Sequence, residues 1–195
     1  MPSGRRLYRR TTWVPAWWRR AVEGPSAWPR RLAVAVLAFA GLLVSFRLAA
    51  YQYGLTGPVW EPWFGDGSAR VLNSAFSRAL PVRDAALGAV AYLLELVLEL
   101  TGGTGRWRRR PWLVLLLGLL ATAMALTALG LLALQAFVVS AFCTLCLLSA
   151  ALSLTVPALL VEEVAAAWRQ VLRGRRYGLP WPRAVLGRAP VRPAP

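Results

Sequence analysis

The chain contains two cysteines, Cys143 and Cys146, within the apolar stretch Phe-Cys-Thr-Leu-Cys-Leu. On a helix this spacing places both sulfur atoms on one face about one turn apart, close enough to form and break a disulfide. The chain has no histidine and no second cysteine pair, so the ligands of a zinc site are missing. The pattern predicts dithiol–disulfide redox chemistry at a membrane surface, with both cysteines catalytic and no metal ion.

The composition predicts an integral membrane protein of one domain. The chain has 195 residues, of which 57% are hydrophobic, and its mean hydropathy is +0.49, more apolar surface than a soluble fold of this length hides. The net charge is +15, and the basic residues, all arginine, lie in blocks between apolar runs. That distribution is typical of orientation in a bilayer and argues against nucleic-acid binding. We expect a multi-pass protein of the cell membrane without a cleavable signal peptide.

Four apolar stretches have about the length needed to cross a hydrocarbon core of roughly 30 Å. They cover residues 32–53, 84–100, 112–134 and 138–160, and the second is the shortest. Only a few residues around Gln135 separate the last two, which predicts a tight antiparallel hairpin. We expect an all-α, integral membrane four-helix bundle over residues 32–160, between basic segments 1–31 and 161–195. Small residues should let its helices approach closely, namely Gly41, Gly88, Gly118 and Gly130, and Pro157 should kink or end the last helix.

Arginine counts predict the orientation of the bundle. Arginines are abundant before the first stretch, in the second connection and in the tail, whereas residues 54–83 hold few and the turn near Gln135 holds none. The positive-inside rule therefore predicts that both termini are cytoplasmic. Cys143 then lies near the outer end of the last helix, on the side where disulfides persist.

The basic segment 1–31 interleaves tryptophans with arginine pairs, which predicts a segment lying on anionic lipid headgroups. The tryptophans are Trp13, Trp17, Trp18 and Trp28. A disordered basic arm that needs no lipid is the alternative. The tail after Tyr177 is rich in proline and arginine, and we expect it to be flexible.

A membrane dithiol needs a two-electron partner, and a lipid-soluble quinone can reach it from the acyl phase. Quinone recognition requires an apolar, aromatic-lined site with one or two polar groups for the ring oxygens. The candidate aromatic residues are Trp60, Trp63, Phe64 and Phe76 of the outer loop, Phe142 beside the first cysteine, and the deeper Tyr92. The alternative role for each is membership of an interfacial aromatic belt.

Ionisable residues near the ends of the predicted helices offer further candidates. Arg47 could pair with an outer-loop carboxylate, bind a quinone oxygen or lower the pKa of a thiol, or it could extend to the headgroups. Asp84 could donate a hydrogen bond to a ketone oxygen, or it could only complement the helix dipole. We expect Glu95 and Glu99, one turn apart, to pair with arginines of the second connection rather than to handle protons.

Residues 32–160 resemble the vitamin K epoxide reductase family, whose bacterial members couple disulfide formation to quinone. The resemblance is carried by the Cys143-Thr-Leu-Cys146 pair, by Ser68-Ala-Arg-Val71-Leu-Asn-Ser74, which is similar to the family motif Cys-x-x-Val-x-x-Ser, and by Pro81-Val-Arg-Asp-Ala-Ala-Leu-Gly88-Ala-Val-Ala-Tyr92. It implies that Cys146 faces the quinone (menaquinone or ubiquinone) and that Cys143 exchanges with an external thiol. It also implies that Asp84 lies near a quinone-contacting position and that Ser74 matches the motif serine.

The chain departs from the family pattern in its outer loop. Ser68 stands where the family has a loop cysteine, and the second loop cysteine is also missing. The usual relay through a loop pair therefore cannot operate. Two interpretations remain: a separate thioredoxin-like protein or substrate thiol exchanges directly with Cys143, or the protein acts on a small molecule or is a non-catalytic membrane scaffold. A channel or transporter has little support, since few polar residues fall within the spans.

Overall fold

The structure, a computed structural model, describes residues 24–75, 77 and 82–187. Predictions for residues 1–23, among them Trp13, Trp17 and Trp18, lie outside these residues, as do Phe76 and the end of the tail from residue 188. The described part of the chain is helical and contains no strand, which agrees with the predicted all-α class.

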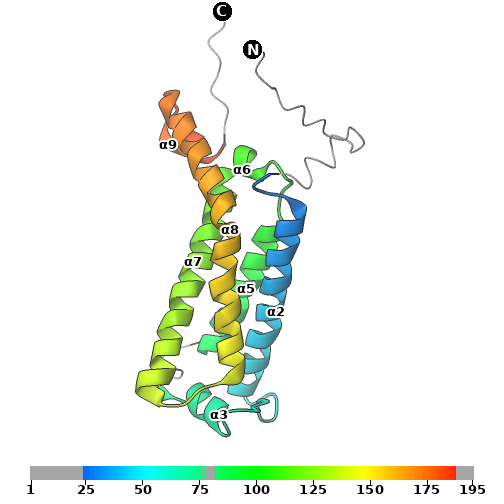
Figure 1. The fold of residues 1–195 in the computed structure, drawn as a ribbon, viewed down its shortest axis with the longest axis vertical. Helices are drawn as coiled ribbons and strands as arrows, with labels where there is room; N and C mark the ends of the chain where they lie inside the picture. The colour runs from blue at the N-terminus through cyan, green and yellow to red at the C-terminus, as the bar shows by residue number, and fades with distance from the viewer. Residues whose placement is uncertain (1–23, 76, 78–81, 188–195) are drawn as a thin grey trace, which may run out of the picture.

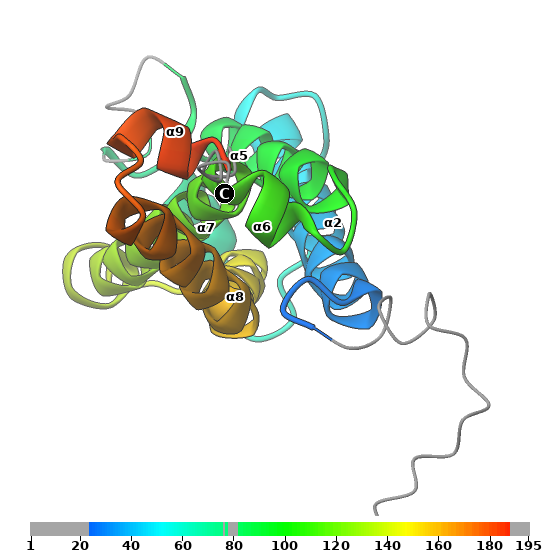
Figure 2. The same ribbon diagram turned by 90° about the horizontal axis from the view of Figure 1, so that it is seen from above.

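Four long helices run side by side along the longest axis of the molecule (Figure 1). They are α2 (Trp28–Gln52), α5 (Asp84–Leu100), α7 (Pro111–Leu134) and α8 (Thr144–Arg176). The short helix α3 (Gly67–Leu72) lies at one end of the bundle, and α6 (Arg106–Arg109) and α9 (Trp181–Val185) lie at the opposite end. Seen from above, α6 and α9 cover that opposite end (Figure 2). We call the two ends the disulfide end, near α3, and the charge-cluster end, near α6.

Three helices are long and apolar enough to cross a membrane, namely Trp28–Gln52, Pro111–Val139 and Thr144–Arg176. The protein is therefore a membrane protein with multiple spans. Helix α5 has 17 residues, which corresponds to about 25 Å of helix and is shorter than a typical hydrocarbon core. A fourth crossing by α5 remains a prediction.

Close contacts through small residues hold the helices together. A Cβ atom added at Gly41 would lie 2.3 Å from the ring of Tyr92, and one at Gly118 would lie 2.6 Å from Val164. These two glycines therefore permit the contacts of α2 with α5 and of α7 with α8, as the sequence predicted. Gly130 has nothing within 4 Å of such an atom, so the prediction of a packing role was wrong there.

The turn between α7 and α8 lies later in the sequence than predicted. Helix α7 continues as the π-helix η1 (Gln135–Val139), the chain turns at residues 140–143, and α8 begins at Thr144. The predicted turn at Gln135 and helix start at residue 138 were therefore wrong. The buried Gln135 holds the turn, because its carbonyl accepts the N–H of Ala141 at 3.2 Å and its Oε1 accepts the N–H of Cys143 at 3.0 Å.

The last helix is also longer than predicted. Pro157 lies inside α8, which continues to Arg176 instead of ending near residue 160. Val171 and Gly174 in its final part are buried, and a Cβ at Gly174 would lie 3.2 Å from Ala184 of α9. This packing between α8 and α9 makes residues 178–187 part of the fold, so the expectation of a flexible tail was wrong there.

Candidate active site

Cys143 and Cys146 are joined by a disulfide at the start of α8, with their Cα atoms 5.1 Å apart. Cys143 is the N-cap residue rather than a residue within the helix, and the backbone N–H of Cys146 donates to its sulfur at 3.2 Å. Cys143 is completely buried, whereas Cys146 is half-buried. The two sulfur atoms therefore differ in how easily a reaction partner can reach them.

The burial of Cys143 comes from the loop that connects α2 to α5. Leu48 of α2 and Leu72 of α3 form a buried cluster with Cys143, and Val71 and Leu145 pack against it. Helix α3 lies at the disulfide end (Figure 1), and its Leu72 is part of the cluster that buries the first cysteine. An external thiol can reach Cys143 only if this cover moves.

The Glu61 carboxylate binds the first turn of α8 beside the disulfide. Its Oε2 accepts the N–H of Thr144 at 2.9 Å, its Oε1 accepts the hydroxyl of Thr144, and the hydroxyl of Ser68 also donates to Oε2. Burial acts to raise the pKa of Glu61, but the hydrogen bonds from Ser68 and Thr144 outweigh it and lower the pKa below its usual value. A carboxylate at a helix N-terminus also complements the helix dipole.

The α2–α5 loop meets the cysteine-bearing turn without space between the two backbones. A Cβ at Gly67 would lie 2.1 Å from the carbonyl oxygen of Phe142, so only glycine fits there. The rings of Phe64 and Phe142 have centroids 5.6 Å apart, and Arg70 donates to the carbonyl of Val139 at 3.2 Å. These contacts attach α3 to the residues that precede the disulfide.

The structure brings only some of the predicted aromatic residues to this site. Phe142 and Phe64 lie together beside the cysteine-bearing turn. Trp60 and Trp63 contact each other with ring centroids 6.1 Å apart, and their exposed fractions are 65% and 72%. Trp63 therefore lies at the surface of the loop and not in the group around the disulfide.

Asp84 and Ser74 belong to a polar cluster at the same end. Oδ1 of Asp84 accepts hydrogen bonds from Gln52 Nε2 at 2.6 Å and from the Ser77 hydroxyl at 2.7 Å. The N–H of Ser77 donates to Ser74 Oγ at 3.3 Å. Oε1 of Gln52 is buried without a hydrogen-bond partner in the described residues. Asp84 acts here as an acceptor, and Gln52 Oε1 is a buried acceptor without a donor among the described residues.

Tyr92 and Arg47 have different surroundings. The Tyr92 side chain is completely buried, and its hydroxyl binds the carbonyl of Ser149 at 2.8 Å and the Ser153 hydroxyl at 2.6 Å. Both serines lie on the face of α8 that carries Cys146, one and two turns further along. Arg47 donates to Thr56 and to the carbonyls of Gly57 and Pro58. It thus anchors the start of the α2–α5 loop, and no hydrogen bond joins it to a described carboxylate or thiol.

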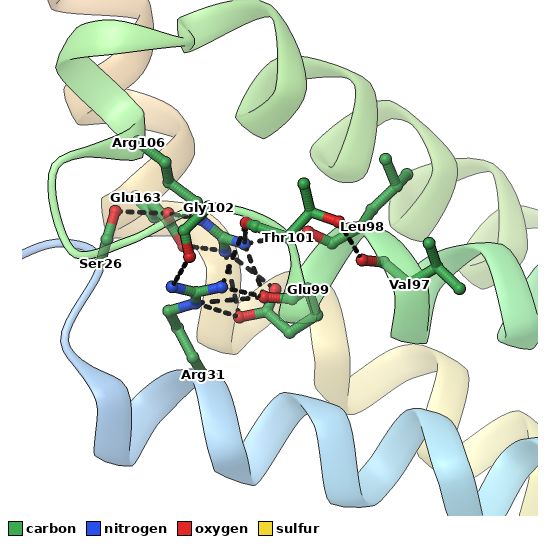
Figure 3. Close-up of polar contacts among 9 residues, drawn as sticks. All are labelled: Ser26, Arg31, Val97, Leu98, Glu99, Thr101, Gly102, Arg106 and Glu163. Atoms are coloured by element: carbon green, nitrogen blue, oxygen red, sulfur yellow. Dashed lines mark hydrogen bonds and ion pairs between the residues drawn. The ribbon is translucent and has the colours of Figure 1, made fainter.

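A second polar cluster lies at the opposite end of the bundle, and we call it the charge cluster (Figure 3). Arg106 pairs with Glu99 at 2.9 Å and with Glu163 at 2.5 Å, and Arg31 pairs with Glu99 at 3.4 Å. All four side chains are at most 2% exposed. Burial acts to lower the pKa of Arg106, but its bonds with Glu163 and Glu99 outweigh it and raise the pKa.

The charge cluster confirms one sequence prediction and corrects another. Glu99 pairs with Arg106 of the second connection, as expected, and it also pairs with Arg31. Glu95 is 1% exposed, and both of its carboxyl oxygens have no hydrogen-bond partner in the described part of the chain. The prediction that Glu95 pairs with an arginine was therefore wrong.

Sequence reasoning missed the roles of Glu61 and Gln135. The sequence identified Glu61 only as a charged residue of the loop, because its hydrogen-bond partner Thr144 lies 83 residues away in the chain. Gln135 stood out only as part of an uncharged turn. A carboxylate in the loop before α3 and an amide before the cysteine pair are signals too common to identify these contacts without the fold.

The fold and the site define a multi-span membrane protein that carries a disulfide at one end of its helical bundle. Residues 32–161 match the model of the vitamin K epoxide reductase family. The match covers about two thirds of the chain, and the protein belongs to this family of membrane oxidoreductases. No curated protein matches the chain.

Proposed function

We propose that the protein is a quinone-linked thiol–disulfide oxidoreductase of the cell membrane that cycles the Cys143–Cys146 pair. The observation that carries the proposal is the disulfide at the start of α8, inside the family's matched residues. Two thiols of an external partner reduce this disulfide and become a disulfide themselves. The reduced pair then transfers two electrons and two protons to a membrane quinone and returns to the disulfide.

The difference in burial between Cys143 and Cys146 supports the assignment of different reaction partners to the two cysteines. Cys146 is half-buried and faces the quinone, whereas Cys143 lies under α3 and exchanges with the partner thiol after the loop moves. The N–H of Cys146 donates to Cys143 Sγ at 3.2 Å, and a helix N-terminus stabilises a thiolate. Cys143 is therefore a good leaving thiolate in the second step, in which the second thiol of the partner attacks the partner sulfur of the mixed disulfide and releases Cys143.

The disulfide end also offers groups that suit a quinone ring. When bound, a quinone supplies a lipid-soluble acceptor of two electrons and two protons. Its reduced form carries hydroxyl groups, and Gln52 Oε1 is a buried acceptor that has no hydrogen-bond partner in the part of the chain that the structure describes. Phe142 and Phe64 supply aromatic surface beside the cysteines, and Asp84 and Ser74 hold Gln52 and Ser77 in place.

The partner is a separate protein with a thioredoxin-like thiol pair. Ser68 cannot relay electrons, and its hydroxyl is bound to Glu61. The partner thiol must therefore reach Cys143 directly. The arginines of α6 and of the last turns of α8 support an orientation in which the charge-cluster end and both termini are cytoplasmic. The disulfide end then faces outward, and α5 completes a four-helix bundle across the membrane.

A non-catalytic membrane scaffold is the second candidate, and the complete burial of Cys143 is the observation that favours it. Buried cysteines often serve as small apolar residues.

One experiment distinguishes the two candidates. Quinone-dependent thiol oxidation is measured in membranes that contain the wild type, Cys146→Ser or Cys143→Ser. The control is Thr155→Ser, an exposed position on the same helix. The enzyme requires loss of the rate in both cysteine variants, and Cys143 of Cys146→Ser must form a mixed disulfide when the partner is supplied in its disulfide form. Unchanged rates of quinone-dependent thiol oxidation in both variants would exclude the enzyme and support the non-catalytic scaffold.

A further inference from the structure

Glu95 occupies an unusual place on the buried face of α5. It lies one turn after Tyr92 and one turn before Glu99, at 1% exposure. Neither of its carboxyl oxygens has a hydrogen-bond partner in the described residues. A buried ionised carboxylate without hydrogen bonds or a counter-ion is strongly unfavourable, whereas a protonated carboxyl is tolerated far better.

The charge cluster one turn away has no positive charge left for Glu95. Its two arginines are matched by two carboxylates, since Arg106 pairs with Glu99 and Glu163 and Arg31 pairs with Glu99. Tyr92, the neighbour on the other side, supplies a neutral hydroxyl that is already engaged with α8. An ionised Glu95 would therefore give this buried region a net negative charge.

Polar groups continue from Glu95 in both directions along the bundle. Towards the disulfide end, the Tyr92 hydroxyl contacts Ser153 Oγ at 2.6 Å and Ser149 Oγ at 3.2 Å. Ser149 follows Cys146 by one helical turn, on the same face of α8. Hydroxyl groups can pass a proton because each both donates and accepts hydrogen bonds.

Towards the other end, Glu99 leads into the charge cluster (Figure 3). Arg106 of that cluster also lines a surface cavity together with the glycine-rich turn of residues 102–105. Water that enters this cavity can reach Arg106 of the cluster, while the apolar core of Val34, Leu117 and Val156 packs between the helices. A series of polar side chains therefore extends from the cysteine-bearing face of α8 to the charge-cluster end, and within it Glu95 has no hydrogen bond to its described neighbours Tyr92 and Glu99.

We propose that Glu95 is a proton-exchanging acid that supplies one of the two protons that the quinone takes up when the Cys143–Cys146 dithiol is oxidised. This inference rests on the proposed function. Oxidation forms the S–S bond and releases two electrons and two protons from the thiols, and the quinone gains two electrons and two protons. One thiol proton goes to the quinone and the other to water at the disulfide end. Glu95 supplies the second quinone proton through Tyr92 and the serines, and it regains a proton from water at the charge-cluster end.

The first test detects the proton on Glu95 without turnover. The infrared spectrum of the purified full-length protein should contain the carbonyl stretch of a protonated carboxylic acid. Glu95→Gln should remove this band, and Glu162→Gln should retain it, because Glu162 is an exposed acid on α8 paired with Arg30. An identical band in wild type and Glu95→Gln, or no such band in the wild type, would overturn the assignment.

The second test measures the rate of quinone-dependent thiol oxidation as a function of pH. Glu95→Gln should lower the rate at least about tenfold, as expected for loss of a group that transfers protons. Tyr92→Phe keeps the ring against Gly41 and should slow the reaction while the infrared band remains. A wild-type rate and pH profile in Glu95→Gln would refute the relay. Failure of the proposed function would appear separately, as unchanged activity in Cys146→Ser.

Discussion

Replacement of Arg106 by methionine tests whether the charge cluster holds the bundle together. Arg106 donates to Glu163 through Nε at 2.5 Å and through Nη2 at 2.8 Å, and to both carboxyl oxygens of Glu99 at 2.9–3.0 Å. Methionine fills most of the volume but removes the charge. Glu163 would then keep only the Ser26 hydroxyl, and Glu99 would keep Arg31 at 3.4 Å.

The expected loss of stability follows from the burial of the ion pairs that Arg106 forms. Removal of one partner of a buried ion pair destabilises a protein by about 3–5 kcal/mol, because the remaining charge loses its compensation. For a chain of about this size each kcal/mol shifts the melting temperature by about 2–4 °C, so Arg106→Met should lower it by roughly 6–20 °C.

The assay is thermal unfolding of the purified protein in detergent, followed by loss of the monodisperse peak after heating. Arg30→Met is the control, since Arg30 of α2 and Glu162 of α8 form an ion pair at 2.5 Å with exposures of 35% and 67%. An exposed pair contributes about 0–1 kcal/mol. The double variant Arg106→Met/Glu163→Gln should be more stable than Arg106→Met alone, because it removes the uncompensated carboxylate. Equal melting temperatures for Arg106→Met and Arg30→Met would refute the reasoning.

Two further predictions concern the disulfide end. Glu61→Gln should destabilise the protein by about 0.3–1 kcal/mol, since the carboxylate complements the N-terminus of α8. The lowered pKa of Glu61 means that its contribution is complete above the unfolded value and is lost as the pH falls through the folded value. Acid unfolding curves of the wild type and Glu61→Gln should therefore converge at low pH, and a constant difference would contradict this assignment. Gly67→Ala should displace α3 from the Phe142 carbonyl and speed alkylation of Cys143 after reduction, whereas Gly57→Ala, with open space around its Cα, should not. Equal alkylation rates in these two variants would show that the α3 contact does not protect Cys143.

The helices and the family could be predicted from the sequence because their signals are local. Apolar runs of membrane-spanning length predicted the helices α2, α7 and α8, and the Cys-x-x-Cys spacing predicted the disulfide between Cys143 and Cys146. The close packing at Gly41 and Gly118 was also visible, since small residues are needed wherever two helix backbones approach.

The details of the candidate site could not be predicted, because they depend on partners far apart in the chain. The bond between Glu61 and Thr144 spans 83 residues, and the pair of Arg106 with Glu163 spans 57. The turn at residues 140–143 has no glycine or proline, and it is held by contacts of the Gln135 side chain and carbonyl. Local propensity cannot indicate such a turn.

The sequence by itself determined the class of chemistry, namely thiol–disulfide exchange by two neighbouring cysteines. It also determined that the chain is apolar enough to be an integral membrane protein. Only the tertiary structure decided which sulfur is covered, which carboxylates are paired and that the buried Glu95 has no hydrogen-bond partner among the described residues. The physical reason is that hydrophobicity and spacing are properties of a segment, whereas burial and charge compensation are properties of the space that α2, α5, α6 and α8 enclose together.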